Sequence, residues 1–147
     1  MKIFWVTLVW LTITSCKLSP VDDSINNVEK VDPDSGIMMI NSASLAEYST
    51  VKKNKIIYKV CKDETDSVIF IRTKSRLFKT SNGVKIGMHL NKFLSKTKGV
   101  ISEEPGWAFV TSLKDGWCAG FGLTEDGYNM AKDSTVKFIF RRSDFPN

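Results

Sequence analysis

The chain has 147 residues, of which 42% are hydrophobic and 25% charged, and its formal net charge is +5. These values fit one globular domain of ordinary composition and exclude a wholly disordered chain, a collagen-like fibre and a multi-pass membrane protein. The charge is unevenly divided, because residues 17–50 carry two basic and six acidic side chains, whereas residues 51–147 carry 18 basic and ten acidic ones. An acidic segment therefore precedes a basic domain.

Residues 1–15 have the composition of a secretory signal peptide. Lys2 supplies the basic start, and an apolar run of about eleven residues extends from Ile3 to Ile13. Because a membrane-spanning helix needs about 20 residues, this run fits the apolar region of a signal peptide. It ends in Ile13-Thr14-Ser15-Cys16, an aliphatic residue and two small residues before a cysteine.

This ending resembles the lipobox of bacterial lipoprotein precursors, over residues 1–16. The resemblance implies cleavage after Ser15 and acylation of Cys16 by a diacylglyceryl group and a further chain such as palmitate. More than one acyl chain makes attachment to a membrane durable. Lys17 stands where an Asp would favour inner-membrane retention in enteric lipoproteins, so the resemblance implies the outer membrane. An ordinary signal peptide or a short uncleaved anchor is the alternative.

Residues 16–50 are predicted to form a lipidated acidic tether that lacks stable structure over residues 17–36, while the short apolar run from Ile37 to Ile40 is compatible with a docking strand. Prolines, a glycine and few large apolar groups leave too little burial to offset the entropy of ordering the chain. The carboxylates at Asp22, Asp23, Asp32 and Asp34 are interpreted as solvated, because their spacing is not that of a calcium-binding loop.

Residues 51–147 are predicted to form a basic α+β domain. Stretches rich in β-branched and aromatic residues predict strands at residues 56–60, 68–72, 76–80, 107–113, 117–123 and 136–140. Polar turns are expected between them at residues 63–66, 81–83 and 114–116. Each of the last three strands carries its bulky side chains on one face, which is typical of an antiparallel sheet with one buried side.

One amphipathic helix is predicted at about residues 89–98. Leu90, Phe93, Leu94 and Thr97 share one face, and Gly99 is the expected C-cap. We therefore expect a two-layer α+β fold, in which an antiparallel sheet of about five or six strands is covered by this helix.

Cys61 and Cys118 are the two cysteines that remain when Cys16 is acylated, an even pair for an oxidising compartment. If their strands are neighbours, a disulfide would stabilise the fold by roughly 3–5 kcal/mol in the chain-entropy model. Two half-buried thiols are the alternative. A redox-active pair is not expected, because the sequence has no Cys-x-x-Cys spacing.

The sequence offers no set of residues that predicts catalysis, a metal site or a cofactor. His89 is the single histidine and is expected at the surface where the helix starts. A zinc site would need several further ligands. Glu103 and Glu104 are expected to be solvated in a turn. We therefore predict a protein that is not an enzyme.

Basic side chains gather in three stretches, residues 52–55, 72–76 and 141–142. The functional interpretation is attraction to anionic lipid headgroups or to an acidic partner, and the alternative is ordinary solvated surface. Nucleic acid is not an expected partner for a lipoprotein. Trp107 and Trp117 are interpreted as core anchors in preference to an exposed binding patch.

The segment from Thr80 to Leu94, with Gly87, Met88, Phe93 and then Gly99, resembles small envelope lipoproteins of the BamE/SmpA type and β-lactamase-inhibitor-like domains. This resemblance covers residues 80–123 and implies a helix-plus-sheet module that binds other proteins. The chain has extra strands before the motif, and no partner-binding residues carry over.

These observations predict a lipid-anchored cell-envelope protein that acts as a non-enzymatic binding or scaffold module for an envelope protein. The sequence does not specify the binding residues. Two alternatives stay open at this point. One is a periplasmic inhibitor that inserts a loop, such as residues 101–106 or 124–134, into an enzyme. The other is a small-ligand carrier, which needs a cavity between helix and sheet.

Overall fold

The computed structural model describes residues 29–30, 34–124, 129–130 and 133–143. The expected signal peptide and Cys16 lie outside these residues. Within these residues the elements are one α-helix, α1 (Leu90–Lys96), one 3-10 helix, η2 (Lys114–Gly116), and the strands β1 (Glu29–Lys30), β2 (Gly36–Met39), β3 (Leu45–Lys53), β4 (Ile56–Lys62), β5 (Val68–Thr73), β6 (Ser102–Glu104), β7 (Ala108–Ser112), β8 (Cys118–Phe121) and β9 (Val136–Arg142).

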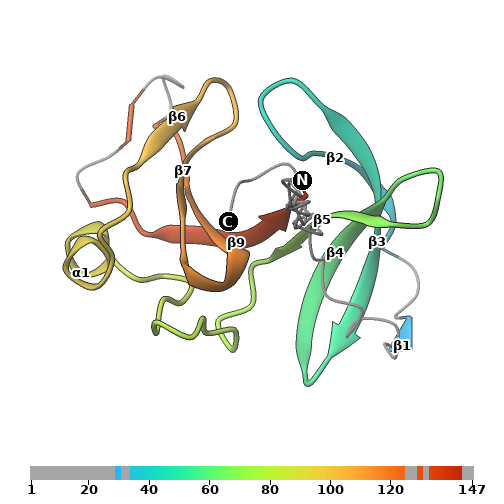
Figure 1. The fold of residues 1–147 in the computed structure, drawn as a ribbon, viewed down its shortest axis with the longest axis horizontal. Coiled ribbons are helices and arrows are strands. Elements are labelled where there is room, and N and C mark those ends of the chain that lie inside the picture. Colours follow the sequence, from blue (N-terminus) through green and yellow to red (C-terminus); the bar gives the residue numbers. More distant parts are fainter. Residues whose placement is uncertain (1–28, 31–33, 125–128, 131–132, 144–147) are drawn as a thin grey trace, which may run out of the picture.

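The strands form one antiparallel sheet that curls into a half-barrel. Eight of them follow one another in the order β1-β3-β4-β5-β9-β8-β7-β6, and β2 pairs with β3 as a hairpin. Figure 1 shows β6 and β7 on one side of β9 and β2, β3 and β4 on the other. The expected fold, five or six strands covered by one helix, is therefore wrong.

Burial on both faces of the central strands explains the correction. Phe138 and Phe140 of β9 face a first core, which also takes buried residues from β2, β4, β5, β7 and β8. Because these strands come from both halves of the sheet, the sheet must curl around that core. Val136 and Ile139 of the same strand face a second core. Two buried faces do not fit a sheet with a single covering layer.

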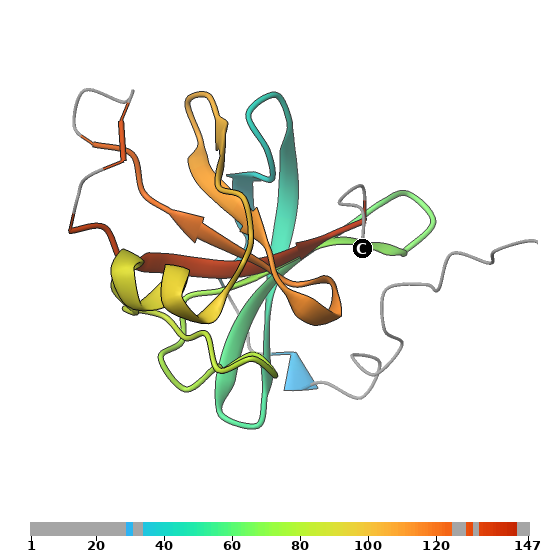
Figure 2. The same cartoon turned by 60° about the vertical axis from the view of Figure 1, so that its left-hand side comes forward.

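Helix α1 covers one end of the sheet and not its whole face. Its buried residue is Phe93, whose ring meets Phe121 of β8 at a centroid distance of 5.1 Å. Figure 2 shows the helix beside the beginning of β9. A helix of seven residues is about 10 Å long at 1.5 Å per residue, so it spans two strands and leaves the rest of the sheet to close on itself.

The sheet also begins earlier in the chain than expected. Residues 36–50, which the sequence assigns to the tether, form β2 and most of β3, and the tyrosine at position 48 pairs with Gly36 in that hairpin. The stretch at residues 76–80 is not a strand, and only an isolated bridge joins Lys79 to Lys85.

The predicted turns are confirmed. The β4–β5 loop closes through a hydrogen bond from the Asp63 backbone N–H to the Ser67 carbonyl at 2.9 Å. Gly83 adopts the expected positive φ, at 79°. Gly99 has a different role from the predicted cap, because the helix ends at Thr97. A Cβ at Gly99 would overlap Thr111 Oγ1 and lie 3.1 Å from the Ser112 carbonyl, so this glycine permits a close approach to β7.

Candidate functional site

A pocket of about 400 Å³ opens beside β4 and β5, and cationic side chains surround it. Its lining residues are Lys55, in the turn before β4, Ile57 and Lys59 of β4, Arg72 of β5, and Lys74 and Ser75, which follow β5. Four of these six residues carry a positive charge, and none carries a carboxylate. We call this feature the cationic pocket.

Strand geometry brings these side chains together. Successive side chains on a strand alternate between faces, so Ile57 and Lys59 of β4 point the same way, while Lys55 lies in the β3–β4 turn and Lys74 directly follows β5. Lys59 and Arg72 are direct partners across the antiparallel pair. Like charges in directly opposed positions destabilise a sheet. The two cations are therefore held close at an energetic cost to the fold.

Buried Thr73 fixes the wall of the cationic pocket from behind. Its hydroxyl donates a hydrogen bond to the Ile57 carbonyl at 2.8 Å and accepts one from the Ser75 backbone N–H at 3.1 Å. This side chain is 1% exposed. Ile57 and Ser75 thus sit on a rigid backbone.

Lys59 at the edge of the pocket is engaged by Asp34. Their charged atoms lie 3.1 Å apart, and the Tyr48 hydroxyl donates to the same carboxylate at 3.0 Å. The ammonium also lies 3.7 Å from the centroid of the Tyr48 ring. The hydrogen bond from Lys59, followed by that from Tyr48, lowers the pKa of Asp34. Burial acts to lower the pKa of Lys59, but hydrogen bonds to Tyr48 and Asp34 raise it overall.

The other cations have no such carboxylate. Within the described part of the chain, Lys55, Arg72 and Lys74 form no ion pair with an acidic side chain. The Arg72 guanidinium lies 5.6 Å from the Phe138 ring centroid, and burial lowers its pKa. The pKa of Lys74 is lowered by burial, then by the positive charges of Arg72 and Lys59. An anion in the pocket would relieve this repulsion.

Two of the three basic stretches of the sequence contribute to this site, and the third does not. Lys55 comes from the first stretch, and Arg72 and Lys74 come from the second. Arg142, from the third, is instead 9% exposed and holds two strands together. It donates to both carboxylate oxygens of Glu104 on β6, at 2.9 and 3.2 Å, and to the Ile40 carbonyl at 3.0 Å.

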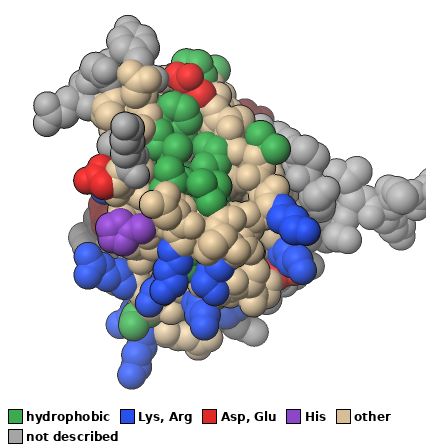
Figure 3. Space-filling view, turned by 90° about the vertical axis from the view of Figure 1, so that its left-hand side faces the viewer, with side chains coloured by type: hydrophobic (Ala, Val, Ile, Leu, Met, Phe, Trp, Pro, Cys, Tyr) green, Lys and Arg blue, Asp and Glu red, His purple; other side chains and the backbone are tan. Residues whose placement is uncertain are grey.

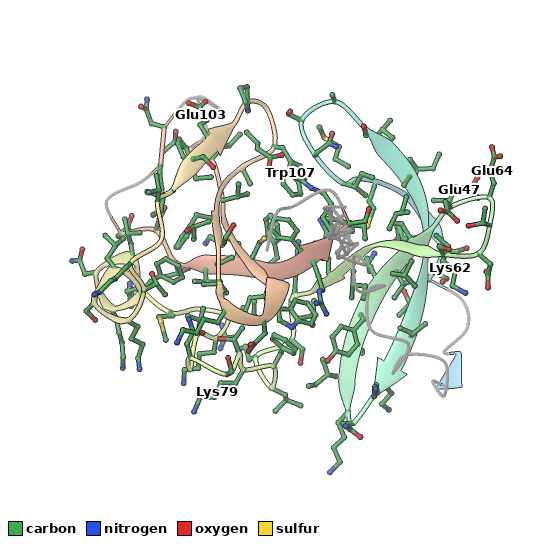
Figure 4. All side chains as sticks on the ribbon, viewed as in Figure 1. Glu47, Lys62, Glu64, Lys79, Glu103 and Trp107 are labelled. Carbon is green, nitrogen blue, oxygen red and sulfur yellow. The ribbon has the colours of Figure 1, made fainter. Side chains whose placement is uncertain are left out.

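That ion pair corrects the expectation of a solvated Glu104. The carboxylate is 16% exposed and bonded bidentately to Arg142. The guanidinium also lies 5.6 Å from the centroid of the Trp107 ring. Figure 4 shows Trp107 between the two halves of the curled sheet, and it packs against the first core, as expected of a core anchor. Trp117 packs against the second core.

Sequence reasoning missed Lys59, Ile57 and Asp34 as members of one site. The alternation of Ile57 and Lys59 was a usable signal, because it places an apolar side chain beside a cation on one strand face. Asp34 gave no signal, since its contact with Lys59 depends on the β2–β3 hairpin, which the sequence assigned to the tether.

The two cysteines carry thiols in the structure and form no disulfide with each other. Both are buried in the first core, Cys61 on β4 and Cys118 on β8. The strands are not neighbours, because β5 and β9 lie between them. Cys61 is paired with Phe70 and Cys118 with Phe140, and these two rings stack at a centroid distance of 5.6 Å. Burial raises the pKa of the Cys61 thiol.

His89 lies on the surface where α1 begins and forms a backbone bridge with Thr135. Figure 3 shows this histidine on a face where apolar side chains gather in the middle and basic ones below. Among the described residues, no group of three or more potential ligands is placed to hold a metal ion. In the same part of the chain, no helix has the length and hydrophobicity needed to cross a membrane.

Comparison with known proteins gives little further information. No family model matches the chain, and no curated protein matches it. Among solved structures, it is similar to the uncharacterized protein yfeY from Escherichia coli, with 14% sequence identity and a TM-score of 0.45 over 76% of this chain and 82% of that chain. A likeness at this level supports no statement about function.

Proposed function

We propose that this chain is a lipid-anchored protein of the bacterial cell envelope that acts as a non-enzymatic binding module. Its binding site is the cationic pocket, and the group that it binds is anionic. The observation that carries this proposal is the convergence of four cations on one pocket, with a single carboxylate, Asp34, at its edge.

The dimensions and the charge of the pocket support a ligand site. Pockets that bind small molecules have volumes of about 300–1,000 Å³, and this one lies within that range at about 400 Å³. Solvated lysines normally spread apart to reduce repulsion. Here the fold brings three lysines and Arg72 to one pocket, and charge-assisted hydrogen bonds to an anion are the strong kind.

The lipid anchor at Cys16 belongs to the same proposal. The lipobox supports it, and Lys17 after the lipidated cysteine favours the outer membrane by resemblance to enteric lipoproteins. The two alternative functions have no comparable support. Phe93 and Phe121 pack closely between helix and sheet, where a carrier would need a cavity. The inhibitor loop at residues 124–134 lies partly outside the described residues.

Titration of the acylated protein in nonionic detergent with pyrophosphate tests the pocket. We expect saturable binding at one site in low salt, and at least about tenfold weaker binding in the double variant Lys55→Gln, Lys74→Gln. The matched control is Lys92→Gln, Lys96→Gln, which removes two exposed cations from α1 and should bind as the wild type does. Equal loss in both variants, or no saturable binding in the wild type, would contradict the proposal.

Acylation is tested separately. Globomycin or Cys16→Ser should leave an unprocessed precursor without lipid. Mature protein of unchanged mass under either condition would contradict the anchor. In-cell crosslinking from position 75, at the pocket, would then identify the envelope partner.

A further inference from the structure

The cationic pocket pairs charge with exposed apolar surface, and this combination restricts the ligand. Ile57 lies in the pocket lining between Lys55 and Lys59, and it is 52% exposed. An isoleucine at this position gives no favourable contact to a small hydrated anion. It does give apolar surface to a ligand whose carbon skeleton continues beyond its charged group.

The number and kind of cations favour a multivalent anion. Asp34 offsets one of the four positive charges, which leaves three facing the pocket. A single carboxylate would neutralise only one of them, whereas a phosphate monoester carries nearly two negative charges at neutral pH. Phosphate also offers three acceptor oxygens, enough for several donors at once.

The donors themselves suit phosphate. Arg72 presents a planar fork that binds phosphate oxygens in pairs. The Phe138 ring, 5.6 Å from the guanidinium, helps to keep this fork in place. The Ser75 hydroxyl oxygen accepts from the Leu77 backbone N–H at 3.3 Å, so its own proton is available to a ligand oxygen.

From these observations we infer that the cationic pocket binds a phosphate monoester with an apolar body, the phosphate lying among Arg72, Lys74 and Lys55 and the apolar part on Ile57. The inference rests on the proposed function and names its ligand class. Such a group occurs both in anionic membrane lipids and in soluble phosphate esters.

The anchor makes the lipid source accessible. The chain that leads back to Cys16 joins the sheet at Glu29 of β1, 13 residues later. At a maximum of about 3.3–3.6 Å per residue, that segment spans up to roughly 45 Å. A domain held at this distance from its own lipid can meet phosphate groups at the membrane surface.

Comparison of methyl phosphate with hexyl phosphate, both titrated into the acylated protein in nonionic detergent, tests the apolar part. We expect hexyl phosphate to bind roughly tenfold more tightly, the effect of burying about two methylene groups. Ile57→Ser should abolish this gain, so that the two esters bind this variant with equal affinity. The matched control is Val100→Ser, at an apolar residue 85% exposed elsewhere, and it should retain the gain.

The outcomes separate the two proposals. Equal affinity for both esters, with methyl phosphate still saturable and sensitive to Lys55→Gln, Lys74→Gln, would overturn the inference and leave the proposed function intact. Failure of methyl phosphate and pyrophosphate alike would overturn both. If Ile57→Ser still binds hexyl phosphate more tightly than methyl phosphate, the inference is also overturned, because the apolar contact would lie elsewhere.

A second arm identifies the source of the phosphate. The acylated protein is placed in phosphatidylcholine vesicles with or without phosphatidic acid, and methyl phosphate is titrated into each. Weaker methyl phosphate binding in the presence of phosphatidic acid shows that a lipid headgroup competes for the pocket. Unchanged methyl phosphate binding, together with the preference for hexyl phosphate over methyl phosphate, supports a soluble phosphate ester as the ligand.

Discussion

Gly120 on β8 is a position where one added methyl group should destabilise the whole fold. It pairs with Phe138 of β9, and the phenyl ring lies directly over it. A Cβ at this position would lie 2.8 Å from Cε1 of that ring and closer still to two other ring carbons. The ring has little room to move, because Trp107 and Phe140 pack against it at centroid distances of 5.6 and 5.7 Å.

The expected cost of Gly120→Ala follows from these contacts. Overpacking a filled core costs typically 1–3 kcal/mol, and the upper end applies where the neighbours are fixed, about 3 kcal/mol. Replacing glycine returns about 0.4–1 kcal/mol through the unfolded chain. The net loss is about 2 kcal/mol, which corresponds to a fall in Tm of about 8–16 °C for a domain of about 100 residues.

Urea denaturation followed by tryptophan fluorescence, together with a thermal melt, measures this loss. Gly122→Ala is the matched control, because its new Cβ would lie 3.6 Å from the nearest Lys137 atom, an ordinary contact. We expect that variant to stay within about 0.5 kcal/mol of the wild type. Wild-type stability in Gly120→Ala, with an unchanged denaturant slope, would refute the packing of Phe138 on β8.

Three further changes test other parts of the account. Glu104→Gln leaves the charge of Arg142 buried without its partner, so we expect a loss of unfolding free energy of roughly 3 kcal/mol in urea titration. Because two strands separate Cys61 from Cys118, protein purified without reductant should show two thiols in non-reducing mass mapping. Because burial raises the pKa of the Cys61 thiol, its alkylation at pH 8 should be slow until the protein is denatured. Asp34→Asn removes the anion that competes for the cationic pocket, so pyrophosphate should bind more tightly by calorimetry.

Each of these predictions has a clear contrary result. Unchanged unfolding free energy in Glu104→Gln would mean that solvent compensates the charge of Arg142. The control is Glu103→Gln, at an exposed carboxylate on the same strand, which should leave the unfolding free energy unchanged. A peptide that joins the two cysteines would contradict the prediction of two thiols. Unchanged or weaker pyrophosphate binding in Asp34→Asn would show that the carboxylate does not compete with the ligand.

Local pattern predicted many of the elements but not their assembly. The residues of β4, β5, β7, β8 and β9 have the β-branched and aromatic character that the sequence analysis used, and Asn82-Gly83 forms its turn. The curl of the sheet was not accessible in this way. It depends on Gly120 admitting the Phe138 ring and on Arg142 reaching Glu104, which are contacts between residues far apart in the sequence.

The β2–β3 hairpin shows why the start of the domain was misplaced. Its first strand is a short apolar run, and β3 mixes polar and apolar side chains, with Leu45 68% exposed, so the segment lacks the regular alternation that identifies a strand. What orders it is pairing with β4 and a few long-range contacts. Among them are the hydrogen bond from Thr50 to the Asp34 carbonyl at 2.7 Å and that from Arg142 to Ile40.

The candidate site was predictable in part. Counting charges along the sequence identified the two basic stretches that supply Lys55, Arg72 and Lys74, because basic residues are concentrated there. It also selected Arg142, whose charge is buried in an ion pair. Sequence alone does not separate a cation that faces a pocket from one that braces the fold, since the difference lies in which carboxylate the curled sheet brings near.

The central claim, that the cationic pocket binds an anion, is tested most directly by side-chain NMR of the acylated protein during titration with methyl phosphate. The account predicts saturable shifts of the Arg72 Nε–Hε and Lys74 Nζ signals at one common affinity, with the Lys92 and Lys96 signals unchanged. Shifts of similar size at all exposed lysines, or an Arg72 signal that does not move, would contradict it.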